Sequence, residues 1–88
     1  MNIYFNKKLI GESEPDINAA TKIMRNYLKD NSVKYVGDYW RWVGLKDNKT
    51  MIDFGSWTDF FYVDCSSEIL FKRDDEKRNL REDKRTES

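Results

Sequence analysis

Aromatic side chains are concentrated in the middle of this chain, and their concentration restricts the folds that the chain can adopt. Residues 35–65 hold nine of the thirteen aromatic residues, arranged in short runs with β-branched neighbours. Gly, Asp, Asn and Ser separate these runs, and all four residue types favour turns. The pattern predicts consecutive β-strands. We expect an antiparallel three-stranded meander formed by residues 39–46, 50–57 and 60–65.

Alternation along the last two of these strands predicts which side chains share a face. We take 58–59 as a two-residue turn, which places Ser56 opposite Phe61 and Asp53 opposite Asp64. The predicted core face then consists of Ile52, Phe54, Phe61, Val63 and Cys65. The opposite face, which carries two aspartates among large side chains and should be partly wet, consists of Met51, Asp53, Gly55, Trp57, Phe60, Tyr62 and Asp64.

The turn between the first two strands decides where two tryptophans lie. A three-residue loop at 47–49 places Trp40 and Trp42 on the core face, and it places Tyr39 and Arg41 on the other face. A two-residue loop would exchange the two sets. We favour the three-residue loop because it gives the larger core.

An amphipathic helix is predicted over residues 15–30, because four apolar residues recur there at helical spacing. Its start has two candidate signals, a capping box formed by Ser13 with Asp16, or Asp16 alone as the N-cap. Asn31 is a candidate left-handed residue at its end. The apolar positions are Ile17, Ala20, Met24 and Leu28.

These elements predict a small α+β fold. Residues 3–10 predict a strand or a tight hairpin, which joins the meander in an antiparallel sheet packed on the one α-helix. Residues 68–72 can add a further strand. We expect one domain over residues 1–72, followed by a charged C-terminal tail, 73–88, that is either an exposed helix or disordered.

Composition excludes several classes of function. The chain has 88 residues, no histidine and one cysteine, Cys65, so it lacks the commonest general base and cannot form an intrachain disulfide. No apolar run approaches the roughly 20 residues of a membrane span, and residues 1–8 lack a signal-peptide pattern. We therefore expect a cytoplasmic protein that binds no membrane and no cofactor or metal.

Charge is balanced along the chain. Sixteen basic and sixteen acidic residues cancel. Residues 72–88 have seven basic and six acidic residues, or +1, which leaves nine basic and ten acidic residues, or −1, elsewhere. Neither part resembles a stripe of cations for phosphate binding.

Facing carboxylates at Asp53 and Asp64 are the one arrangement that could carry chemistry, as a cation site or an acid–base pair. The chain has no loop with acidic residues at alternating positions, so an enzyme is the least favoured function. We expect a protein without enzymatic activity.

The wet aromatic face is the strongest functional signal, because exposed apolar patches on this scale usually meet a partner. We expect it to bind another protein, as a small inhibitor or adaptor. The many Lys, Asn, Ile and Asp residues are common in proteins of AT-rich genomes, including those of phages of low-GC bacteria, so a phage protein is one expectation. A homodimer, cover by the chain's own ends, and single-stranded nucleic acid stacked on the same aromatics are the alternatives. The expected partner-binding residues are Tyr39, Arg41, Met51, Asp53, Trp57, Asp59, Phe60, Tyr62 and Asp64.

Overall fold

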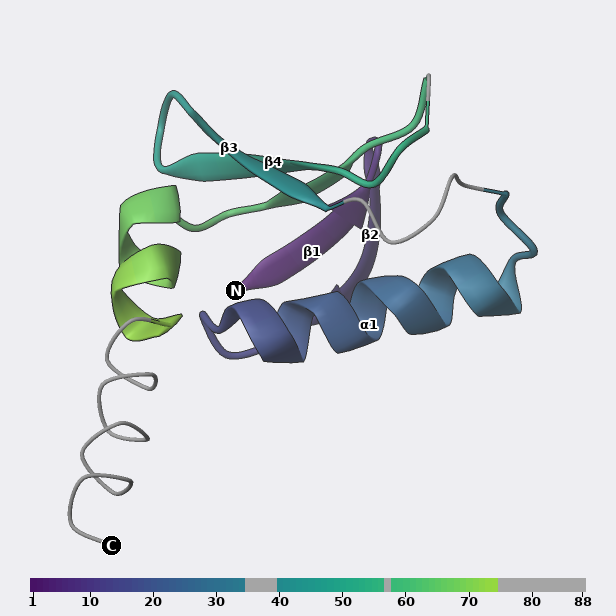
Figure 1. Ribbon diagram of the computed structural model, residues 1–88, viewed down its shortest axis with the longest axis horizontal. Helices are drawn as coiled ribbons and strands as arrows, with labels where there is room; N and C mark the ends of the chain where they lie inside the picture. Colours follow the sequence, from purple (N-terminus) through teal and green to yellow (C-terminus); the bar gives the residue numbers. More distant parts are fainter. Residues whose placement is uncertain (35–39, 57, 75–88) are drawn as a thin grey trace, which may run out of the picture.

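Five strands form one antiparallel sheet in the order β2-β1-β5-β4-β3, and a long helix, α1, lies along one face of it (Figure 1). The computed structural model describes residues 1–34, 40–56 and 58–74. This architecture confirms the predicted α+β fold. The elements are β1 Asn2–Phe5, β2 Lys8–Glu12, α1 Ile17–Asp30, β3 Arg41–Leu45, β4 Lys49–Asp53 and β5 Phe61–Val63.

The N-terminal segment is a hairpin rather than a single strand. Its two-residue turn contains Asn6 with φ 54°, a left-handed conformation that Asn tolerates well. Strand β1 lies between β2 and β5, and Ile3 faces Val63 in the ladder. Ile3 is fully buried, so the first strand belongs to the core of the sheet.

Asp16 alone is the N-cap of α1. This confirms the second of the two predicted start signals and not the capping box with Ser13. Its carboxylate accepts a hydrogen bond from the backbone N–H of Ala19 at 3.3 Å. The prediction of a left-handed Asn31 is wrong: Asn31 has φ −103° and Ser32 has φ 52°. The helix buries Ala20, Met24 and Leu28 against the sheet.

The turn between β3 and β4 has three residues, as predicted, but it occupies 46–48 instead of 47–49. Asp47 and Asn48 both adopt left-handed backbone conformations there, with φ 62° and 57°. The shift changes the partner of Trp42 from Phe54 to Ile52. Because the partner changes by two residues, the face does not change, and Trp40 and Trp42 pack against the core as predicted.

The connection between β4 and β5 is longer than the predicted two-residue turn, and the predicted register is wrong by four residues. Phe61 faces Ile52 instead of Ser56. The strand ends early because the Asp53 carboxylate accepts a hydrogen bond from the N–H of Gly55 at 3.0 Å, and Gly55 has φ 94°. An even shift again preserves the faces, so Ile52, Phe54, Phe61 and Val63 are buried as predicted and Cys65 is half-buried beside them.

The predicted strand at 68–72 is wrong, since residues 67–74 are helical. The Ser66 hydroxyl accepts a hydrogen bond from the N–H of Glu68 at 3.2 Å and so caps the first turn. Leu70 is buried in the same core as α1, whereas Ile69 and Phe71 remain exposed. The tail prediction beyond position 74 lies outside the described residues.

Aromatic rings fill the space between α1 and the sheet. Phe61 lies 5.1 Å from Phe54 and 5.2 Å from Phe5, measured between ring centroids, and the Trp40 ring stacks on Phe61 at 6.1 Å. The guanidinium of Arg25, on α1, lies 5.4 Å from the centre of the Trp40 ring. The core is therefore built on one face of the sheet only.

Candidate functional site

The face of the sheet away from α1 carries a row of five apolar and aromatic side chains that crosses all five strands. Tyr4 pairs with Leu9 on β2 and with Tyr62 on β5, and Met51 pairs with Tyr62 and with Val43 on β3. Directly opposed residues in antiparallel strands share a face, so the five side chains are neighbours. Leu9 is 53% exposed, and the other four are half-buried.

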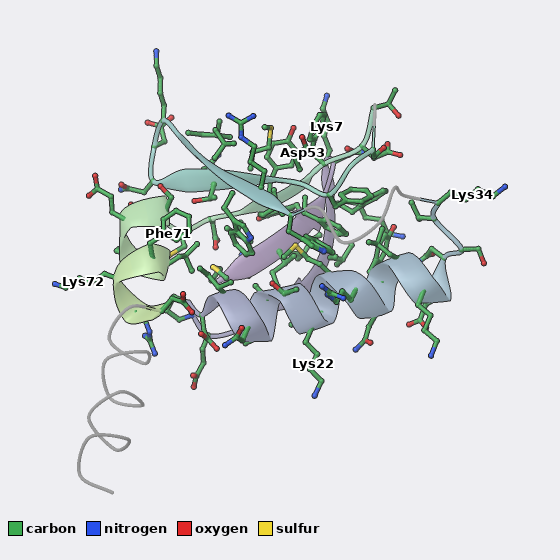
Figure 2. All side chains as sticks on the ribbon, in the orientation of Figure 1. Lys7, Lys22, Lys34, Asp53, Phe71 and Lys72 are labelled. Carbon is green, nitrogen blue, oxygen red and sulfur yellow. The ribbon has the colours of Figure 1, made fainter. Side chains whose placement is uncertain are left out.

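We call this side of the sheet the open face, and the five residues the cross-strand row. Among the described residues, no helix covers the open face, whereas α1 runs along the other side (Figure 1). Figure 2 shows Asp53 and Lys7 projecting from the open face, while Lys22 points away from the sheet on the far side of α1. The described helices therefore leave the row uncovered.

A hollow of about 730 Å³ lies on the open face, over β1 and β5. Tyr4, Phe60 and Tyr62 give it an aromatic lining, and Lys7 and Lys49 border it. The segment between β4 and β5 rises above the sheet on this side (Figure 1) and contributes Thr58. The remaining lining residues are Asn6, Val63 and Asp64.

Asn6 ties the β1–β2 turn to the segment that precedes β5. Its side-chain amide donates a hydrogen bond to the Asp59 carboxylate at 2.9 Å, and its side-chain oxygen accepts one from the N–H of Phe60 at 3.0 Å. The backbone N–H of Asn6 also donates to the carbonyl of Phe60 at 2.8 Å. These three bonds fix one wall of the hollow.

The other two aspartates of the open face are also engaged in local hydrogen bonds. The Asp64 carboxylate accepts a hydrogen bond from the N–H of Asn2 at 2.6 Å, and Asp53 accepts the bond from Gly55 described above. Both acceptors satisfy the backbone of this chain. Their oxygens therefore have less capacity for an external ligand.

The basic side chains on the open face differ from these aspartates in their exposure and in their hydrogen bonding. Lys7 and Lys49 are exposed, and within residues 1–34, 40–56 and 58–74 neither ammonium group has a hydrogen bond or an ion pair. Arg41 is exposed and faces Asp53 across the β3–β4 ladder. In the described part of the chain, Lys7 and Lys49 are thus lysines without a partner that lie beside aromatic rings, with Asp64 in the same lining.

The predicted pairing of Asp53 with Asp64 is wrong. Asp53 ends β4 and faces Arg41, whereas Asp64 follows Val63, which faces Thr50 near the start of β4. The two carboxylates consequently lie toward opposite ends of the strand. No group of three or more acidic or cysteine side chains in the described part of the chain could hold a metal ion.

Most of the other predicted binding residues lie on or beside the open face. Met51 and Tyr62 belong to the cross-strand row, Phe60 lines the hollow, and Asp59 supports its wall. Tyr39 and Trp57 lie outside the described residues. Five residues of the row and of the border of the hollow were not predicted as binding residues: Tyr4, Lys7, Leu9, Val43 and Lys49. The first three meet this surface only because β1 and β2 lie beside β5, which the sequence did not indicate.

No protein-family model, curated protein or solved structure matches the chain. In the ranges that the structure describes, no helix has both the length and the apolar character needed to cross a bilayer.

Proposed function

We propose that this chain is a non-enzymatic protein-binding module that contacts a larger partner through the open face. The cross-strand row carries this proposal, because it combines tyrosine, methionine and aliphatic side chains on a face that no described helix covers. Tyrosine and methionine are enriched at the centres of protein interfaces. Burial of such a row removes apolar surface from water without any change in the fold.

Tyr62 and Met51 are the expected centre of the contact. They occupy β5 and β4, and their neighbours on each side, Tyr4 and Val43, extend the row toward both edges. Charged residues surround the row, which matches the apolar centre and polar rim of a typical interface. Substitutions at the centre should therefore weaken binding most.

The expected biological role is that of a small cytoplasmic inhibitor or adaptor, of the kind that phages encode. Support comes from the amino-acid usage, which is rich in Lys, Asn, Ile and Asp. Such a protein acts by occupying a surface of its partner. A second copy of this chain is a competing occupant of the open face.

Single-stranded nucleic acid is the second candidate. Tyr4 and Tyr62 are cross-strand neighbours that could stack bases, and Lys7 and Lys49 border them. Charge argues against it, since three aspartates match the three basic residues of this face, which are Lys7, Lys49 and Arg41. A phosphate backbone gains most of its affinity from an excess of cations.

The test is affinity capture from lysate of the native host with the immobilised chain, followed by a direct binding measurement with the captured protein. We expect Tyr62→Ser to reduce the affinity by about a hundredfold, since it removes a central aromatic contact. Ile69→Ser is the matched control, because Ile69 is 50% exposed but lies on the helix at 67–74. Urea unfolding of both variants checks that the fold is intact.

Equal capture by wild type and Tyr62→Ser would contradict the proposal. Tight binding of oligo-dT or oligo-rU at about 50 mM salt would support the second candidate instead. Sedimentation that shows a dimer disrupted by Tyr62→Ser would assign the open face to self-association.

A further inference from the structure

We propose that the open-face hollow is an anchor site for an acidic segment of the partner protein, in which an apolar or aromatic side chain stands between carboxylates. This inference rests on the proposed protein-binding function and specifies its partner. The hollow supplies both halves of the required complementarity, aromatic rings in its lining and cations at its ends.

The two lysines lie at opposite ends of the hollow. Strands β1 and β4 run in the same direction, because both are antiparallel to β5. Lys49 starts β4, whereas Lys7 follows the end of β1 in the turn. About four strand residues separate the two levels, or roughly 13 Å at about 3.3 Å per residue. Strand β5 lies between β1 and β4 and adds about 10 Å across the sheet, at about 4.8 Å per strand spacing. An extended peptide that spans roughly 16 Å would place a carboxylate near each lysine and a side chain between them.

The two lysines favour a ligand with a carboxylate at two separate positions, whereas the balanced charge of the whole open face disfavours a long polyanion such as nucleic acid. The charged lining residues are Lys7, Lys49 and Asp64. The Asp64 carboxylate accepts a hydrogen bond from the N–H of Asn2, whereas the Lys7 and Lys49 ammonium groups have no partner among the described residues. A partner that covered these lysines with apolar groups would leave buried cations uncompensated. A partner with carboxylates would form charge-assisted hydrogen bonds to them instead.

The aromatic lining fixes the neutral part of the ligand. Tyr4 and Tyr62 are directly opposed on adjacent strands, and Phe60 lies two residues before Tyr62 on the same face. The Asn6 bonds hold Phe60 in place, so the lining is formed before a ligand arrives. A preformed site loses less conformational entropy on binding. Aromatic or leucine side chains in the partner segment match these rings.

Synthetic peptides can test the charge requirement directly. The probe is a peptide of about ten residues with a central Phe-Leu pair and two glutamates on each side, and its control carries glutamine at the same four positions. We expect the acidic peptide to shift the amide signals of Tyr4, Phe60 and Tyr62 in the ¹⁵N-labelled full chain. Its affinity should exceed that of the glutamine peptide by at least about tenfold, and salt should reduce the difference.

Lysine variants locate the charge. Lys7→Gln combined with Lys49→Gln should lower the affinity for the acidic peptide by at least about tenfold, because both charge-assisted contacts are lost. Lys22→Gln combined with Lys34→Gln changes the net charge equally. These two lysines are exposed, and they belong to α1 and to the segment that follows it (Figure 2). We expect the control pair to leave the affinity unchanged.

Equal affinity for the two peptides, no shift with either, or equal losses in both lysine pairs would overturn this inference. Tighter binding of oligo-dT than of the acidic peptide would assign the hollow to nucleic acid. The proposed function and this inference can fail separately. If Tyr62→Ser abolishes partner capture while the Lys7 and Lys49 variant retains it, the open face binds a protein but not through an acidic segment.

Discussion

The two faces of the sheet are built from the same strands yet differ in what their side chains do. On β5, Phe61 and Val63 are buried under α1, while Tyr62 between them is half-buried on the open face. On β4, Ile52 is buried and Met51 is half-buried. The face under α1 holds the fully buried side chains, whereas the open face carries apolar side chains that folding buries only in part. This difference in burial predicts that substitutions on the two faces will differ in their effect on stability.

Removal of a core ring should give the largest effect. We expect Phe61→Ala to lower the free energy of unfolding by about 3–5 kcal/mol, because the fully buried ring contacts Phe5, Phe54 and Trp40. Tyr62→Ser, one residue away, should cost less than about 1 kcal/mol. Urea titration measures both values. Similar losses in the two variants would remove the distinction between the faces; if Phe61→Ala fails to fold, Phe61→Leu provides the comparison.

The helix at 67–74 adds Leu70 to the core, and substitution of Leu70 tests how much this helix contributes to stability. Leu70→Ala should lower the free energy of unfolding by about 2–4 kcal/mol, because a fully buried side chain leaves a cavity. Ile69→Ala is the control on the same helix, and it should change stability by no more than about 0.5 kcal/mol since Ile69 is exposed. Comparable values from urea unfolding would mean that this helix does not pack on the core.

Asn6 tests whether the hollow is preformed. Asn6→Gly keeps the left-handed backbone accessible but removes both side-chain bonds, so we expect a loss of about 1–2 kcal/mol. Faster amide exchange should be confined to the segment around Phe60. The control is Asn26→Ala, which removes an asparagine side chain from the exposed side of α1. Alanine is used there because glycine would weaken the helix. Unchanged exchange at Phe60 would show that the wall does not depend on Asn6.

The sequence was sufficient to predict which face of the sheet each side chain occupies, but not which residues pair across neighbouring strands. Alternation of Ile52, Phe54, Phe61 and Val63 against Met51 and Tyr62 depends on local pattern, and both register errors were even, so each side chain kept its face. The turn positions depend on backbone geometry at Asp47, Asn48 and Gly55, and several residues nearby could have adopted it. Consequently the pairing of Asp53 with Asp64 failed even though both faces were right.

The contacts between segments far apart in the sequence were the second feature that could not be predicted. The Glu68–Lys72 segment alternates like a strand, but the Ser66 cap and burial of Leu70 against the core favour a helix. Tyr4 alternates with Ile3 and Phe5, which indicates the face of its own strand but not the neighbour of that strand. Only the pairing of β1 with β5 brings Tyr4 beside Tyr62 and creates the lining of the hollow.

The adjacency of β1 and β5 also has a consequence during protein synthesis. Ile3 meets Val63 across almost the whole length of the described chain. A nascent chain can complete its N-terminal hairpin early, but that hairpin has no neighbour to join until β5 has been made. The aromatic lining shared by Tyr4 and Tyr62 therefore forms only after both strands have been synthesised and have paired.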